Sequence, residues 1–141
     1  MASPCPICPT DPTSFVLRKV SEKGQRVVYY THPSKVKQEY SSEAIIAHYR
    51  HMLSEKGPAT WVWVFDGAGF DTDHIMELKT GQGIAELLET LHLATLQEVN
   101  IINPSVHLKV LLKVIRPFMS DALKAKLRIL DDRPRSVLEF M

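Results

Sequence analysis

The stretch WVWVFDGAGFD, residues 61–71, carries the clearest structural signal in the chain. Its first five residues are apolar at every position, whereas a strand with one face in water alternates apolar and polar side chains. We therefore predict that residues 61–65 form a strand buried on both faces, in the middle of a sheet that helices cover. The next residues, Asp66-Gly67-Ala68-Gly69, are of types that favour turns, and they end this strand in a loop.

Strand and helix patterns alternate on either side of this strand. Residues 15–20 and the β-branched and aromatic residues 26–31 predict a hairpin, and residues 99–102 predict another strand. Apolar residues at helical spacing predict further elements. The predicted helices run from Ser41 to before Gly57, from about 83 to 97, from 105 to 116, and from 120 to about 127. This order predicts an α/β fold in which helices cover a mixed, partly parallel sheet.

A chain of 141 residues is long enough for one domain with a real core. Residues 1–14 hold four of the nine prolines, which lack an amide donor, so we expect an irregular N-terminal segment there. The remaining residues, 15–141, are predicted to form a single domain.

Composition and motifs exclude several classes of protein. A formal net charge of +1 gives no sign of nucleic-acid binding, and two cysteines do not make a secreted disulfide framework. We see no signal peptide and no apolar run of the ~20 residues that a membrane helix needs. We therefore expect a soluble, cytoplasmic protein. No spacing assembles a catalytic triad or a phosphate-binding glycine loop, so we expect no enzymatic activity.

Three segments, taken in order, resemble the CRAL-TRIO lipid-binding family. WVWVFDGAGFD is similar to its central strand and Asp-x-x-Gly turn, here Asp66 and Gly69. VNIINPS, residues 99–105, is similar to its next strand and turn. LLKVIRPFMSDALKAKLRIL, residues 111–130, is similar to its following helix, its Lys/Arg-Pro-Phe element and its Lys-rich ending. The resemblance covers about residues 60–130, and extends to residues 15–60 only in the order of the elements.

The resemblance implies that a sheet floors an apolar pocket and that helices close over it. It also implies that the domain is C-terminally short, because the chain stops at Met141 before the family's final segment. The expected function is non-enzymatic binding of a hydrophobic small molecule or a phospholipid. The alternative is a protein–protein interaction module, including dimerisation, as in the divergent branch of that family. The apolar residues expected to contact a ligand are Trp61, Trp63, Phe65, Ile101, Leu112 and Phe118.

Charged residues are distributed unevenly along the chain. Residues 59–100 carry seven acids and one base, whereas residues 105–128 carry six bases and one acid. Lys109, Lys113 and Arg116 are spaced so that they share one helix face, while the apolar residues of that helix are expected to pack on the sheet. We expect the basic face to contact an anionic headgroup or, peripherally, a membrane surface, at roughly 1 kcal/mol per basic residue. The other interpretation is a solvated surface.

Cys5 and Cys8 are three residues apart, a spacing at which two thiolates bind one zinc ion. His48 and His51 lie three residues apart on a predicted helix and are the candidates for the other two ligands. The alternative is a pair of free thiols and two exposed histidines. Zinc at these four residues is the one cofactor that the sequence suggests.

Overall fold

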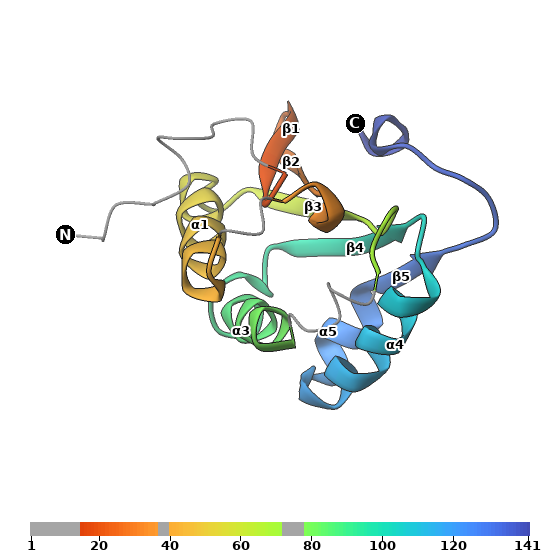
Figure 1. Cartoon of the computed structure of the whole chain (residues 1–141). Coiled ribbons are helices and arrows are strands. Elements are labelled where there is room, and N and C mark those ends of the chain that lie inside the picture. Colours follow the sequence, from red (N-terminus) through yellow and green to blue (C-terminus); the bar gives the residue numbers. More distant parts are fainter. Residues whose placement is uncertain (1–14, 37–39, 72–77) are drawn as a thin grey trace.

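The computed structural model describes residues 15–36, 40–71 and 78–141. In this part of the chain a five-stranded sheet has the order β1-β2-β3-β4-β5 (Figure 1). Its strands are β1 (Arg18–Lys23), β2 (Arg26–Thr31), β3 (Thr60–Asp66), β4 (Leu96–Ile102) and β5 (Leu127–Leu130). β1 is antiparallel to β2, and the other three pairs are parallel, so the sheet is mixed and partly parallel, as predicted.

Helices connect the parallel strands. They are α1 (Ser42–Glu55), α3 (Leu78–Leu87), which continues into the π-helical turn η2 (Leu88–His92), α4 (Val106–Ile115) and α5 (Asp121–Lys126). Short 3₁₀ turns are η1 (Pro33–Lys35), η3 (Arg116–Phe118) and η4 (Val137–Phe140). Ser41, Ser105 and Ser120 cap α1, α4 and α5 by accepting a backbone N–H, which confirms the predicted helix starts. No helix in the described ranges is both long and apolar enough to cross a membrane.

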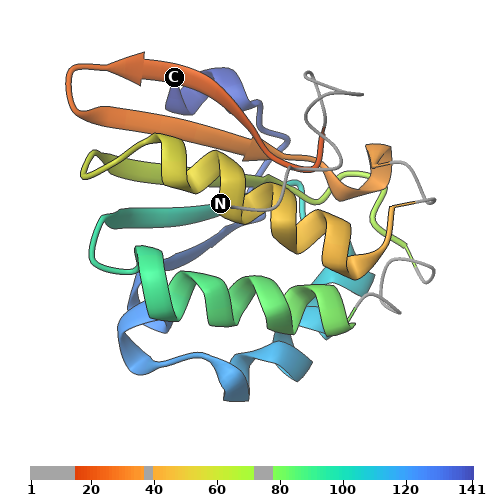
Figure 2. The ribbon, with the colours of Figure 1, turned by 90° about the vertical axis from the view of Figure 1, so that its left-hand side faces the viewer.

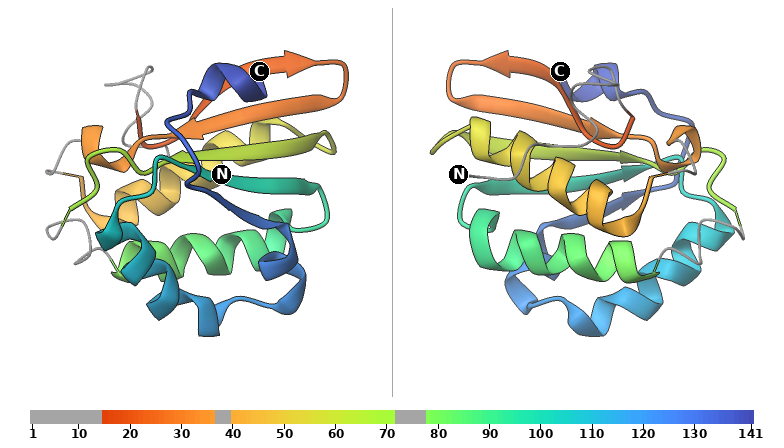
Figure 3. Two further views of the ribbon diagram at one scale, coloured as in Figure 1. Left: turned by 90° about the vertical axis from the view of Figure 1, so that its right-hand side faces the viewer. Right: turned by 60° about the vertical axis from the view of Figure 1, so that its left-hand side comes forward.

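The side chains of β3 alternate between two cores. Trp61, Trp63 and Phe65 pack on the helix side of the sheet, and Val62 and Val64 belong to a smaller core on the other side. α1 and α3 lie over the helix side (Figure 2), and α4 and α5 also contribute buried residues to that core. The C-terminal segment with η4 crosses the opposite face (Figure 3). The strand is therefore buried on both faces, as predicted.

Three elements differ from the predictions. The first strand of the hairpin, predicted over residues 15–20, is β1 at Arg18–Lys23. The helix predicted from 83 to 97 corresponds to α3, which the structure describes from Leu78. Its glycines, Gly81 and Gly83, lie inside the helix where neighbouring helices come close, so they do not mark its start. The helix also ends earlier than predicted, because β4 begins at Leu96. β5 was missed altogether. It is a four-residue strand at the edge of the sheet with no fully buried residue, so its sequence lacks the continuous apolar pattern that identified β3.

A buried hydrogen-bond network lies at the carboxyl ends of the strands, around the carboxylate of Asp66 in β3. Oδ2 accepts the hydroxyl of Tyr30 from β2 at 2.8 Å. Oδ1 accepts the backbone N–H of Ala68 at 3.0 Å and the side-chain amide of Asn103, which follows β4, at 3.2 Å. Nδ1 of His32 lies 3.5 Å from Oδ2. One side chain therefore joins the ends of three neighbouring strands.

Asn103 extends this network to the C-terminal segment. Its side chain exchanges two hydrogen bonds with the backbone of Arg135, at 2.8 Å and 2.9 Å. The backbone of Asn103 has a φ of 49°, a left-handed conformation that asparagine tolerates better than most residues. Beyond it, Arg26 of β2 donates to the carbonyl of Phe140 at 3.2 Å. These bonds hold the C-terminal segment across the second face of the sheet.

Replacing Asp66 by Ala should destabilise the fold by about 3 kcal/mol, because the hydroxyl of Tyr30, the N–H of Ala68 and the side-chain amide of Asn103 all lose the acceptor that joins them. Urea unfolding of the variant and the wild type measures this difference. Glu86→Ala is the control, since this exposed acid should change the free energy of unfolding by less than about 0.5 kcal/mol. Similar losses in both variants would contradict the structural role of Asp66.

Candidate functional site

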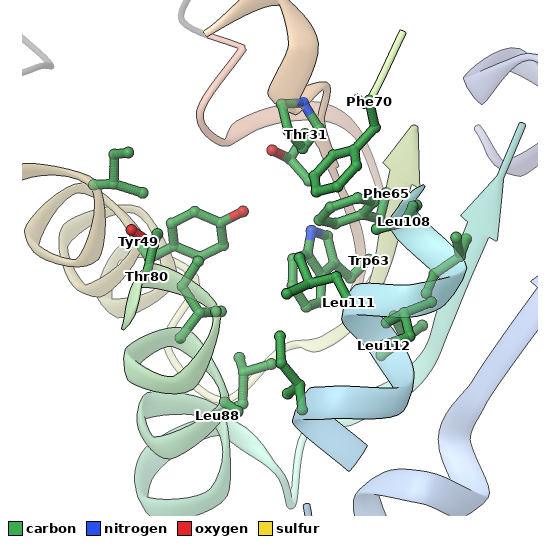
Figure 4. Close-up of a pocket in the computed structure, with 18 of the residues that line it drawn as sticks. Thr31, Tyr49, Trp63, Phe65, Phe70, Thr80, Leu88, Leu108, Leu111 and Leu112 are labelled. Carbon is green, nitrogen blue, oxygen red and sulfur yellow. The ribbon is translucent and has the colours of Figure 1, made fainter. Parts of the chain in front are cut away.

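An apolar cavity of about 610 Å³ lies on the helix side of the sheet. Trp63, Phe65 and Ile101 form its floor on the sheet, and α1, α3, α4 and α5 all contribute to its walls (Figure 4). Tyr49 of α1 and Leu111 of α4 lie on opposite sides of the open space. The cavity extends to the end of β2 and the turn η1, so it lies toward the carboxyl ends of the parallel strands, where α/β folds usually bind ligands.

The helices around the cavity meet at glycines of α3. A Cβ on Gly81 would lie 2.6 Å from Cδ1 of Ile115, so a larger residue there would displace the Ile115 side chain of α4. Gly83 faces Ile46 of α1 in the same way. α3 therefore contacts both α1 and α4 at its glycines, and the cavity lies between these helices and the sheet.

Few polar groups line this cavity. Thr31 donates its hydroxyl to the carbonyl of Phe15 at 3.0 Å, and Thr80 donates to Ser42 at 2.7 Å. Burial raises the pKa of Tyr49 and outweighs the hydrogen bond with the side chain of Thr31, which lowers it, so Tyr49 stays neutral. None of the described lining residues carries a charged side chain.

Two buried polar atoms of the lining residues have no hydrogen-bond partner. They are Nε1 of Trp63, a residue only 8% exposed, and the hydroxyl oxygen of Tyr40. Buried polar groups in native proteins are nearly always paired, with protein, water or a ligand.

Four of the six apolar residues predicted to contact a ligand do line the cavity: Trp63, Phe65, Ile101 and Leu112. Trp61 does not, because it lies near the start of β3, away from the cavity, where its Nε1 donates to the carbonyl of His92 at 3.3 Å. Phe118 does not either, and it is 62% exposed. The chain leaves the α-helical path at η3, and the next residue, Met119, reaches the cavity instead.

Sequence reasoning missed the lining residues that lie outside regular apolar patterns. Tyr40 precedes α1, and Phe70 lies in the loop after β3. Thr31 and Thr80 are polar, so no apolar pattern includes them. Tyr49 belongs to the apolar face predicted for α1, but that pattern alone does not distinguish a cavity wall from an ordinary core.

The outer face of α4 carries two parallel rows of residues. Helical spacing places the predicted basic residues Lys109, Lys113 and Arg116 in one row. Of these, Lys113 and Arg116 are exposed, whereas Lys109 is half-buried and pairs with Asp131 at 2.8 Å. The second row was not predicted. It is apolar and consists of Val106, Val110 and Val114, which are 74%, 46% and 46% exposed, with Phe118 beyond the end of the helix.

The apolar side of α4 is buried, as predicted. Leu108 and Ile115 belong to the same core as Val99 and Ile101 of β4. The cavity occupies part of the space between this helix and the sheet, so the packing is less direct than the predicted contact with residues 99–102.

The structure places the two histidines of the predicted zinc site in different surroundings. His48 is 2% exposed and its Nε2 lies 2.7 Å from the carbonyl of Leu17, whereas His51 is exposed and pairs with Glu55 at 3.1 Å. No three potential metal ligands gather among the described residues. Cys5 and Cys8 lie outside those residues, so the zinc site stays a prediction.

Comparison with known families gives one result for this site. The family model of the CRAL/TRIO domain matches residues 13–140, a range that includes the whole sheet, all the described helices and every lining residue. A search of curated proteins finds no match to the chain.

Truncating a leucine beside the cavity should cost less than truncating one in the filled core. Leu111 lines the cavity, whereas Leu53 of α1 is 1% exposed and does not. We expect Leu53→Ala to lower the free energy of unfolding by about 4 kcal/mol and Leu111→Ala by about 2 kcal/mol, because a side chain beside a void has fewer neighbours to lose. Urea unfolding of the ligand-free proteins measures both values. Equal losses would mean that the cavity is filled in solution.

Proposed function

The chain belongs to the CRAL/TRIO domain family of lipid-binding domains, and we propose that it binds one lipophilic small molecule in the cavity between its sheet and helices. Domains of this family bind and transfer lipids and are generally not enzymes. The observation that carries the proposal is the apolar cavity of about 610 Å³, which lies within the range of ~300–1,000 Å³ typical of small-molecule sites.

The physical reason for binding is the apolar wall. A hydrocarbon ligand that leaves water for this cavity gains about 25 cal/mol for each Å² of apolar surface that it buries. It also restores the dispersion contacts that the wall residues lack while the cavity is empty. Aromatic rings of Trp63 and Phe65 on the floor and leucines on the helices suit a ligand with a conjugated or branched chain.

A single-tryptophan variant tests ligand binding. Trp61 and Trp63 are the two tryptophans of the chain, so Trp61→Phe leaves only the one that lines the cavity. Retinol added to this variant should quench the remaining fluorescence in a saturable way, with one site per chain. Native mass spectrometry of the protein as purified should also detect a bound lipid.

Ala85→Phe is the matched control for this test. Ala85 lies on α3 and lines the cavity, so a phenylalanine there fills part of the space. The variant should keep its circular dichroism spectrum but lose most of its retinol binding. Unsaturable quenching, together with a ligand-free mass for the wild type, would overturn the proposed function.

We further infer that the outer face of α4 contacts anionic membrane surfaces. Its apolar row suits the boundary between headgroups and acyl chains, and the adjacent basic row suits anionic headgroups. Lys113 and Arg116 should contribute most to membrane binding, since Lys109 already pairs with Asp131. On this proposal α4 lies between the cavity and the membrane surface. A ligand that moves from one to the other therefore has only a short distance to travel.

Replacing Lys113 and Arg116 together by Ala should weaken binding to phosphatidylserine vesicles by about 30-fold, since each charge contributes roughly 1 kcal/mol near such a surface. Folding should barely change, because both side chains are exposed. Co-sedimentation at low and high salt measures binding, and salt should reduce it in the wild type. Lys19→Ala/Lys23→Ala on β1 is the matched control with the same loss of charge.

The alternative, a protein-interaction module, is supported by the exposed apolar row of α4. A row that includes Val106 at 74% exposure and Phe118 at 62% is unusual for a surface without a partner. The vesicle experiment separates the two interpretations. If the wild type binds no vesicles at any salt and light scattering finds a dimer that Val110→Ser/Val114→Ser dissociates, the apolar row is a protein interface.

A further inference from the structure

The C-terminal segment of the chain is attached to the second face of the sheet at two places. Near its start the side chain of Asn103 binds the backbone of Arg135, and at η4 the guanidinium of Arg26 donates to the carbonyl of Phe140. Val137 and Phe140 pack against the smaller core on that face. Figure 3 shows the segment crossing this face. The turn η4 therefore supplies two of the side chains that cover the second face.

Ser136 lies between these two attachments, at the start of η4, and it is exposed. Its hydroxyl oxygen accepts the backbone N–H of Leu138 at 3.2 Å, and its own N–H donates to Oε2 of Glu139 at 3.2 Å, so the two ends of the turn form a capping box. The backbone of Ser136 is extended, with a φ of −123° and a ψ of 151°. An enzyme that binds extended segments can therefore reach this hydroxyl.

The charge pattern before Ser136 is one that arginine-directed protein kinases select, because these enzymes recognise an arginine three residues before the target serine. Two serines of the chain have such an arginine: Arg18 precedes Ser21, and Arg133 precedes Ser136. Ser21 is half-buried within β1, whose backbone pairs with β2. Ser136 is exposed and lies outside the strands of the sheet. The fold therefore leaves Ser136 as the accessible serine of the two.

The carboxylate of Glu139 is held beside Ser136 by two arginines. Its Oε1 lies 2.6 Å from Nη2 of Arg133 and 3.6 Å from Nη1 of Arg135. The hydrogen bond from Arg133 lowers the pKa of Glu139, so this group is ionised at neutral pH. A phosphoryl group on the Ser136 hydroxyl would add a charge of about −1.5 to −2 next to this carboxylate and compete for both guanidinium groups. Glu139 would then be repelled and lose its partners.

We propose that Ser136 is a phosphorylation site for an arginine-directed protein kinase, and that the phosphoryl group detaches η4 from the second face of the sheet. In the transfer, Oγ of Ser136 forms a bond to the γ-phosphorus of ATP, the bond from that phosphorus to the β–γ bridging oxygen breaks, and ADP leaves. The hydroxyl proton passes to the catalytic base of the kinase. Repulsion of Glu139 opens the turn that carries Phe140, and the apolar core beneath it is exposed. This inference does not depend on lipid binding in the cavity.

Phosphorylation of the folded chain tests the site. The catalytic subunit of cAMP-dependent protein kinase, with ATP and Mg²⁺, should phosphorylate Ser136 and not Ser21, and peptide mass spectrometry locates the phosphate. Ser136→Ala should abolish the reaction. Arg133→Gln should slow it about tenfold or more, because a charged contact with the kinase is lost. Arg128→Gln is the matched control, since this exposed arginine also pairs with an acid but lies outside the recognised segment, and it should leave the rate unchanged.

Methyl NMR spectroscopy tests the detachment of η4. The ring of Phe140 packs against the core that contains Val28, Val62 and Val64, so its ring current should shift their methyl resonances, and Phe140→Ala shows their positions without it. Phosphorylation of the wild type should move these resonances to the positions found in Phe140→Ala. Phosphorylated Glu139→Gln is the control, because a glutamine can complete the capping box and carries no charge for the phosphate to repel. Its valine resonances should stay in place.

Each outcome decides one part of the inference. Absence of phosphate on Ser136, or an equal rate of phosphorylation at Ser21, would overturn the assignment of the site. Phosphorylation that leaves the valine resonances in place, or that moves them equally in Glu139→Gln, would overturn the detachment of η4 by charge repulsion. None of these results bears on the proposed function, because retinol binding by the Trp61→Phe protein is measured separately.

Discussion

The hydrogen bonds to the carboxylate of Asp66 are the constraint on which the rest of the structure depends. This buried group lies where β2, β3 and β4 end, and it accepts bonds from Tyr30 in β2, from Ala68 after β3 and from Asn103 after β4. The cavity reaches the same edge of the sheet, since Thr31 and Pro33 are among its lining residues. Asn103 carries the connection onward to the C-terminal segment, and thus to the second face of the sheet.

The helices are held together by different contacts from those that hold the sheet. The sheet is held by continuous strand pairing and by this buried network, whereas the helices meet at glycine contacts such as Gly81 against Ile115. A layer that packs at its edges leaves space between its apolar faces and the sheet. In this way the sheet side chains away from the cavity form a packed core, while the cavity lies between the sheet and the helices.

The sequence patterns predicted the elements that apolar periodicity defines, and they failed where another constraint decided the structure. The fully apolar β3 and the serine-capped helices were predictable from local residues alone. β5 was not, because a short edge strand leaves no distinctive pattern. Four floor and wall residues, including Trp63, were predicted from alternation and family resemblance. The polar wall residues and the apolar outer row of α4 were not, since only the packed structure shows which side chains remain unpaired or exposed.

The cavity behind α4 also bears on how stable the protein is in a cell. A molecule that fills it binds only the native state, so its presence raises the free energy of unfolding by mass action. Degradation often proceeds through unfolded molecules, and a change of 1–2 kcal/mol alters steady-state abundance several-fold. On the proposed function, the amount of this protein should therefore rise and fall with the supply of its ligand, without any change in its synthesis.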